Sequence, residues 1–421
     1  MRNEGRRHEM HRRALLLSAA CAAVSGCAAN AGVSEPTPPS VEPRPAPILT
    51  PGADPFDVAL YCAVANAPGN QFVSPYSVAS AFALLYPGAR GQTAAEIGAT
   101  LRFDADIARA TTQTRATAQA ISVQTGGSEF TAANAAWVER TMALRAEYAR
   151  TLEQELSATI EPVPFIANQT AALRTINAWA ARETRDRIPT ILTEPDESRR
   201  LVLTNAVYFK GKWSDQFAAN ATQDGDFFAQ TGATERVRLM HQITSARYLD
   251  GEGFQAAEFD YDDRAFALSV FLPRARDGLP AFEAQLAGNR LDRWMQDLSA
   301  APQARLSVTL PKVEMSADYD LVPQLRALGM RLAFTDSADF SGITEQAALA
   351  ISAVIHKTFL AIDEEGTEAA AVTAIDMRVT AVRLPEEPPI PFRADHPFFI
   401  VLHHKPTRTR LFLGRIASVA A

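Results

Sequence analysis

The sequence predicts one large domain of the α+β class, preceded by an N-terminal segment that lies outside the fold. Runs that favour strands and runs that favour helices are mixed without the regular alternation of a doubly wound fold. The chain of 421 residues is 47% hydrophobic and 21% charged, which is ordinary globular usage and leaves ample length for a core. A formal net charge of -7 argues against nucleic acid as the main partner.

Residues 1–26 have the pattern of an export signal. Five arginines precede a short apolar run at residues 14–24, which is too short to span a bilayer as a stable helix. Small residues then lead into Cys27, as at the acylation site of bacterial lipoproteins. We therefore expect a lipid on Cys27 that holds an exported protein on the cell envelope, at the outer membrane and facing the periplasm or the outside. Ordinary secretory cleavage near Asn30 is the alternative.

Residues 27–53 are expected to form a proline-rich tether. Seven of the seventeen residues from Glu35 to Pro51 are proline, a composition that favours a semi-rigid polyproline II spacer. The folded domain is then predicted to occupy residues 54–421. Three cysteines cannot build a disulfide framework in a chain of this length, and the apolar surroundings of Cys62 indicate a buried thiol rather than a reactive one.

Within the domain, the pattern predicts strands and helices in irregular order. The predicted strands are Leu201 to Phe209, Ala265 to Leu272, Arg305 to Leu310, Phe359 to Ile362, Phe398 to Leu402 and Arg410 to Ile416. The predicted helices are Phe56 to Ala65, Ser77 to Tyr86, Ala171 to Arg185 and Tyr319 to Leu328.

The sequence contains no recognisable catalytic, cofactor or metal motif. We find no nucleophile elbow, no zinc-protease motif, no phosphate-binding loop and no pair of cysteines at metal-ligand spacing. The adjacent His403 and His404 would face opposite ways on a strand and could not share one metal. A large domain without such a constellation favours a binding or inhibitory protein over an enzyme, with no cofactor expected.

The segment from Ile362 to Pro391 is the most informative part of the chain. An apolar strand is followed by an acidic turn with Gly366, a run of small residues and a proline-rich stretch. Read with the period of a strand from Thr367 to Arg378, one face is uncharged and the other carries every charge. The uncharged face consists of Thr367, Ala369, Ala371, Thr373, Ile375 and Met377. A segment that suits both a loop and a half-buried strand is a candidate conformational switch, although an alanine-rich helix is the alternative.

Motifs in one order along the chain show that the sequence resembles the serpin family of serine protease inhibitors. They are residues 72–77 (FVSPYS), 88–93 (GARGQT) with Glu96, 177–179 (NAW), 203–213 (LTNAVYFKGKW), 310–312 (LPK), 338–343 (ADFSGI), 364–373 (EEGTEAAAVT), 394–398 (ADHPF) and 413–415 (LGR). The resemblance implies three β-sheets, about nine helices and an exposed reactive-centre loop. It also implies that a target protease cleaves the loop, forms an acyl-enzyme and is trapped when the loop inserts into the main sheet.

By similarity, two groups of residues take part in that change. The loop hinge is implied at Glu364, Glu365, Gly366, Thr367, Glu368, Ala369, Ala370 and Ala371. A polar shutter beneath the sheet is implied at Ser74, Ser77, Asn205 and His356, with Trp213 where the loop first enters. Core packing of these residues is the structural alternative, and for the shutter the two descriptions overlap.

The family rule for counting from Glu364 predicts the reactive bond at Thr380–Ala381. A small residue there suits elastase-like or subtilisin-like proteases. Cleavage after Met377 would suit chymotrypsin-like enzymes, and cleavage after Arg378 or Arg383 would suit trypsin-like enzymes. We expect a monomer whose partner is a serine protease, bound as a covalent acyl complex.

Other classes of function stay open from sequence alone. A non-inhibitory protein of the same fold could bind a ligand or act as a chaperone, and its loop would then be an ordinary protease substrate. An envelope adhesion domain is a further possibility. A hydrolase is disfavoured because no nucleophile–base pairing is found.

Overall fold

The computed structural model describes residues 54–122, 127–156, 160–345, 349–367 and 387–419. The chain divides into two units, Met1–Pro43 and Arg44–Ala421, and all described residues belong to the second. The export signal, most of the tether and Cys27 therefore lie outside the described residues, and the predicted domain limits stay predictions. Among the described helices, none is both long enough and apolar enough to cross a membrane.

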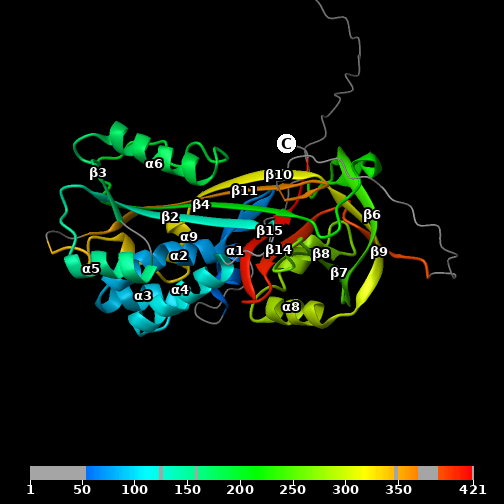
Figure 1. The fold of residues 1–421 in the computed structure, drawn as a ribbon, viewed down its shortest axis with the longest axis horizontal. Helices are drawn as coiled ribbons and strands as arrows, with labels where there is room; N and C mark the ends of the chain where they lie inside the picture. The colour runs from blue at the N-terminus through cyan, green and yellow to red at the C-terminus, as the bar shows by residue number, and fades with distance from the viewer. Residues whose placement is uncertain (1–53, 123–126, 157–159, 346–348, 368–386, 420–421) are drawn as a thin grey trace, which may run out of the picture. The chain divides into compact units, whose positions relative to one another are not determined.

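A six-stranded main sheet has the strand order β10-β11-β12-β4-β2-β3 (Figure 1). The two central strands, β4 and β11, run parallel and pair directly over residues 201–207 and 351–358. Beyond that stretch the two-residue strand β12 lies between them. The strands are β10 (Val313–Asp320), β11 (Ile351–Ile362), β12 (Gly366–Thr367), β4 (Leu201–Lys212), β2 (Glu129–Glu139) and β3 (Ile160–Val163).

The remaining strands form one nine-stranded sheet, in which the long strand β6 (Thr234–Gly251) links two parts. Residues 234–247 of β6 pair with β5 and β9, whereas its last residues pair with β7, so the strand belongs to both parts. The other members are β1 (Gln71–Val73), β5 (Gln223–Phe228), β7 (Phe254–Asp260), β8 (Phe266–Pro273), β9 (Gln303–Pro311), β13 (Ile390–Arg393), β14 (Phe398–His404) and β15 (Thr409–Ile416).

Nine α-helices occur in the described residues, and they cover the main sheet unequally. Figure 1 shows α6 alone on one side of the sheet and α2, α3 and α4 on the other. The helices are α1 (Phe56–Val64), α2 (Pro75–Leu85), α3 (Gly91–Leu101), α4 (Ile107–Ser122), α5 (Ala146–Thr151), α6 (Gln169–Glu183), α7 (Leu279–Glu283), α8 (Arg290–Ala300) and α9 (Val322–Ala327). The described residues also include the short 3-10 helices η1 (Tyr86–Gly88), η3 (Ala219–Ala221) and η4 (Leu332–Phe334) and the short π-helix η2 (Leu152–Leu156).

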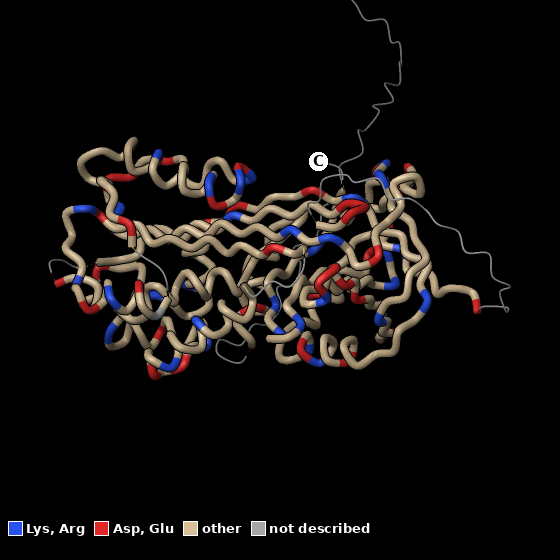
Figure 2. Tube along the Cα trace, in the orientation of Figure 1, with Lys and Arg blue, Asp and Glu red and all other residues tan. Residues whose placement is uncertain are grey.

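The main sheet is buried on both faces because its strands alternate between two apolar clusters. From β4, Val202 and Ala206 pack toward α6 in one cluster, whereas Leu201 and Leu203 pack with α1 and α2 in another. Charge is absent from β4 before Lys210. On the neighbouring central strand β11, Lys357 is charged and forms an ion pair with Asp318 of β10, and charged positions are visible along the strands in Figure 2.

The predicted fold class is confirmed, and the two largest errors in element limits are at Tyr319 and Phe359. The α+β mixture is as predicted, and two of the three expected sheets are continuous through β6. The helix expected from Tyr319 begins only at Val322, because Tyr319 and Asp320 end strand β10 and Pro323 lies in the first turn of the helix. Strand β11 begins at Ile351, eight positions before the predicted start at Phe359.

Candidate functional site

The hinge begins with a tight turn at Asp363 that leads into β12. The Asp363 carboxylate accepts hydrogen bonds from the backbone N–H groups of Glu365 (2.9 Å) and Gly366 (3.1 Å). The Asp363 N–H in turn donates to the carbonyl oxygen of Gly366 (2.9 Å). Burial raises the pKa of the Asp363 carboxyl above its ordinary value, even though both N–H groups act in the opposite direction. Hydrogen bonds within the turn therefore fix its shape, and the chain reverses direction and re-enters the sheet as β12.

Only glycine fits at position 366, because the backbone of β4 lies too close to leave room for a side chain. The φ of Gly366 is 156°, in a region that side chains rarely adopt, and a Cβ there would collide with the carbonyl oxygen of Gly211 and lie 2.7 Å from Cα of Lys212. Glycine therefore lets the hinge approach β4 at backbone distance. Any larger residue would force β12 away from β4.

Thr367 lies fully inside the protein, between the two central strands. It pairs with Gly211 of β4 and with Ile362 of β11, in both cases antiparallel, and none of its surface is exposed. Its side chain points to the interior, as the period-two pattern predicts. The Thr367 hydroxyl forms a hydrogen bond of 2.7 Å with the hydroxyl of Tyr261.

The segment that follows β4 holds the hinge by its backbone. The backbone N–H of Trp213 donates to the carbonyl of Glu365 (2.8 Å), its indole N–H donates to the carbonyl of Asp363 (2.9 Å), and the N–H of Phe217 donates to the carbonyl of Glu364 (2.8 Å). Trp213 also stacks on Tyr261, with ring centroids 4.7 Å apart. Trp213 thus contacts the hinge directly, and its role where the loop enters the sheet stays a prediction.

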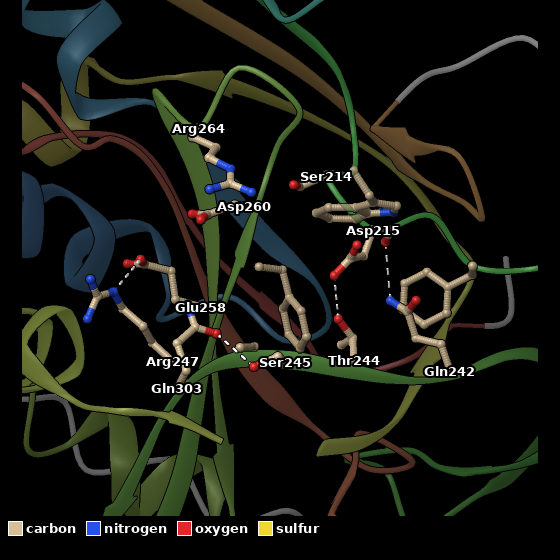
Figure 3. Close-up of a pocket in the computed structure, with 14 residues that line it drawn as sticks. Ser214, Asp215, Gln242, Thr244, Ser245, Arg247, Glu258, Asp260, Arg264 and Gln303 are labelled. Atoms are coloured by element: carbon tan, nitrogen blue, oxygen red, sulfur yellow. Dashed lines mark hydrogen bonds and ion pairs between the residues drawn. The ribbon is translucent and has the colours of Figure 1, made fainter. Parts of the chain in front are cut away.

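A polar cavity of about 260 Å³ lies beside this segment (Figure 3). There Thr244 of β6 donates to the Asp215 carboxylate (2.7 Å), and the Gln242 side chain donates to the Asp215 carbonyl (3.3 Å). The segment from Trp213 to Phe217 is thereby tied to β6 as well as to the hinge. It forms a fixed support rather than a loose loop.

Glu364 anchors the hinge electrostatically. Its carboxylate accepts a hydrogen bond from Lys312 Nζ (2.7 Å) and another from the Thr222 hydroxyl (2.8 Å). Burial acts to raise the pKa of Glu364, but these two donors outweigh it and hold the pKa below its ordinary value. Lys312 belongs to a motif that the sequence identified, but its contact with the hinge was not predicted.

A buried polar cluster joins β4 to β11 below the hinge. The backbone N–H of Ser74 donates to His356 Nε2 (3.0 Å), so the ring proton is on Nδ1 and donates to Asn205 Oδ1. The Asn205 amide then donates to the hydroxyl of Ser77 and to Asn134 Oδ1. The structure thus brings the four predicted shutter residues together and adds Asn134.

Burial keeps His356 neutral. Its side chain is fully inaccessible, and desolvation lowers the pKa of the imidazole to about 3. A second ring proton would also face the N–H of Ser74 rather than an acceptor. The cluster is therefore satisfied only with the imidazole uncharged.

The reactive loop itself is outside the described residues. This applies to Glu368, Ala369, Ala370 and Ala371, to the predicted reactive bond at Thr380–Ala381 and to the alternatives at Met377, Arg378 and Arg383. Their roles stay predictions. Sequence reasoning missed Tyr261 and Asn134, since neither belongs to a motif and each meets its partner only through the fold.

The fold and the hinge together place a two-residue strand, β12, between the two parallel central strands of the main sheet. The family model described as serpin (serine protease inhibitor) matches residues 52–419. The chain belongs to the serpin family.

Named relatives include several inhibitors. The chain is 35% identical to an uncharacterized serpin-like protein of Thermococcus kodakarensis, over 86% of this chain and 83% of the relative. It is 34% identical to the leukocyte elastase inhibitor of Bos taurus (84% and 94% covered) and 33% identical to Iripin-2 of Ixodes ricinus (87% and 93%).

Solved structures agree on the fold. Human thyroxine-binding globulin superposes with a TM-score of 0.79 at 24% identity, covering 88% of this chain and 98% of that one. Serpin48 of Tenebrio molitor gives a TM-score of 0.76 at 27% identity, with 88% and 97% covered. Serpins are serine protease inhibitors as a family, not catalysts.

We expect the stability of the protein to fall with acid through His356. Its pKa in the native state is about 3 against an ordinary value of 6.5, so between these limits the unfolded chain binds a proton that the native state excludes. The stability contribution is complete above pH 6.5 and is lost toward pH 3, by at most about 1.4 kcal/mol per pH unit. Urea unfolding between pH 7.5 and 4.5 measures it. The slope should be shallower in His356→Gln, and equal slopes would contradict the assignment.

Proposed function

We propose that the protein is a suicide inhibitor of serine proteases, of the elastase-like or subtilisin-like class. The observation that carries the proposal is the position of β12, which already lies between β4 and β11 as the first two residues of an additional strand. The family description and the name of the leukocyte elastase inhibitor of Bos taurus support it. The name of the Bos taurus relative also favours an elastase as target, in line with a small residue at Thr380.

In the proposed reaction, the protease serine oxygen attacks the carbonyl carbon of Thr380. The peptide bond to Ala381 breaks, the new amine takes a proton from the protease's catalytic acid, and an ester joins Thr380 to the protease. Residues from Glu368 onward then enter the sheet behind Thr367. Trapping succeeds if insertion is faster than hydrolysis of that ester.

The register of β12 determines where each inserted residue would lie. Continuing its pairing residue by residue brings Thr373 opposite Asn205 of β4 and opposite His356 of β11. These two side chains now bond each other across the strands that would part. In the inserted form that we propose, the Thr373 hydroxyl takes the place of that lost bond, and the polar cluster stays satisfied.

Localisation belongs to the same proposal. A lipid on Cys27 and a proline-rich tether would place the inhibitor on the outside of a bacterial membrane, where secreted proteases act. The basic, apolar and small-residue order of residues 1–27 supports it.

We expect an SDS-stable covalent complex when the full chain is incubated with elastase or subtilisin. The peptide released from that reaction should begin at Ala381, which mass spectrometry can determine. Chymotrypsin and trypsin serve as controls, since complexes with them would move the reactive bond to Met377 or to an arginine. Cleavage by every protease without any complex would contradict inhibition.

We expect Thr367→Arg to turn the inhibitor into a substrate. The Thr367 side chain has no exposed surface, and a guanidinium buried there without a partner would be costly. Insertion should then stall while the fold persists, so the moles of inhibitor consumed per mole of protease should rise at least about tenfold. The matched control is Thr367→Ser, which keeps the hydroxyl. Undiminished inhibition by the arginine variant would refute loop insertion.

We expect Thr373→Val to weaken only the cleaved form. With strands parted, Asn205 and His356 would lack the hydroxyl that satisfies them, at a cost of about 1–3 kcal/mol. Urea midpoints of cleaved and uncleaved protein should show a loss in the cleaved form alone. Val372→Thr, which adds a hydroxyl on the opposite face, is the control and should leave both midpoints unchanged. A loss confined to uncleaved protein would exclude this register.

A further inference from the structure

Tyr261 occupies a fixed position directly beneath the hinge. Its ring stacks on Trp213 at 4.7 Å and meets the edge of Phe209 at 4.8 Å, and the residue has no exposed surface. Its backbone is also fixed, since Tyr261 bridges to Trp213 and its N–H donates to the carbonyl of Phe266. The hydroxyl is thereby held in one place, 2.7 Å from Thr367 Oγ1.

The chain leaves room for this contact at one glycine. A Cβ on Gly211 would lie 2.7 Å from the Tyr261 ring, so only glycine lets the ring reach past β4 to Thr367. Gly211 is also the residue that Thr367 pairs with and that Gly366 approaches. The ring, the glycine and the hinge thus fit together as one site, contributed by three segments far apart in sequence.

We propose that Tyr261 is a positioning residue that holds Thr367 in its inserted position and fixes the register in which the rest of the loop follows. This inference rests on the proposed function for its kinetic consequence, but not for the contact itself. Inside the sheet, the Thr367 hydroxyl is satisfied by Tyr261, and outside the sheet water satisfies it. Removing the tyrosine hydroxyl therefore penalises only the inserted position.

The same contact selects the register. A shift of one residue would turn every following side chain to the other face and would place Glu368 against the Tyr261 hydroxyl in an apolar site. The correct register instead brings a small, hydroxyl-bearing side chain to the tyrosine. Tyr261 therefore acts before cleavage, by making the first step of insertion complete in the uncleaved protein.

In the proposed reaction, the rate of loop insertion competes with the rate at which water hydrolyses the acyl-enzyme. If Thr367 leaves the sheet, insertion has to begin one step earlier while the ester remains exposed to water. More of the inhibitor is then cleaved without trapping the protease. The stoichiometry of inhibition should rise although the loop is cleaved at least as readily.

The test is a double-mutant cycle in the full chain, using Tyr261→Phe, Thr367→Val and both together. Amide hydrogen exchange of residues 363–367 reports the inserted position without any protease. We expect exchange in each single variant to be about five- to a hundredfold faster than in the native sequence, since each leaves one buried hydroxyl unsatisfied. The double variant pairs two apolar groups, so its exchange should return toward the native rate. Stoichiometry against the inhibited protease should follow the same order.

Tyr148→Phe is the matched control. Tyr148 is also buried, and its hydroxyl donates to the carbonyl of Leu84, away from the hinge. This variant should lose stability without changing exchange at residues 363–367 or the stoichiometry. A Tyr261→Phe variant that exchanges at the native rate, or a double variant no better than the singles, overturns the inference. If the native sequence inhibits no protease, the proposed function fails, and hydrogen exchange alone decides the role of Tyr261.

Discussion

The structure depends on the parallel pairing of the two central strands of the main sheet, β4 and β11. Each of these strands has an antiparallel neighbour on its outer side, β2 for β4 and β10 for β11. An antiparallel strand placed between them would replace one parallel pair with two antiparallel pairs, and antiparallel pairing is the slightly more stable form per residue. The two residues of β12 have already made that exchange at one end. A longer antiparallel segment in the same place would extend this replacement along both central strands.

The buried polar cluster adds a hydrogen bond between the two central strands, in a sheet whose other contacts are largely apolar. His356 and Asn205 lie opposite each other on β11 and β4, so their hydrogen bond crosses the boundary that would open. A buried polar pair left without partners is costly, which resists opening by chance. In the insertion that we propose, the entering strand would offer a hydrogen-bonding side chain at the matching position, so the same two side chains would stabilise the closed sheet and select the inserted strand.

The sequence predicted those features that depend on residues close together along the chain. The alternation from Thr367 onward indicated an inward face, and the Gly366 turn indicated the point where the chain bends back. Strand β11 was predicted only from Phe359, because Ser352, His356 and Lys357 interrupt its apolar pattern, and His356 is polar for its bond to Asn205 rather than for exposure. The helix predicted from Tyr319 was wrong because the apolar spacing there comes from the end of a strand running into a short helix. Tyr261 carried no local signal, since its partner is distant in sequence and the glycine that admits it belongs to another strand.

The positions of the charged hinge residues also fit the register of β12. Glu364 is held by Lys312 and Thr222 at the edge of the sheet, so the chain is tethered before it turns inward. In the register of β12, Glu368 would lie opposite Lys210, the first charged residue of β4, on the outer face of the sheet. A carboxylate there gains an opposite charge, and the uncharged residues on either side of it fall on the buried face. Glu364 is therefore held at the start of the hinge by its ion pair with Lys312, and in the insertion that we propose, burial of the uncharged face would direct the rest of the loop between β4 and β11.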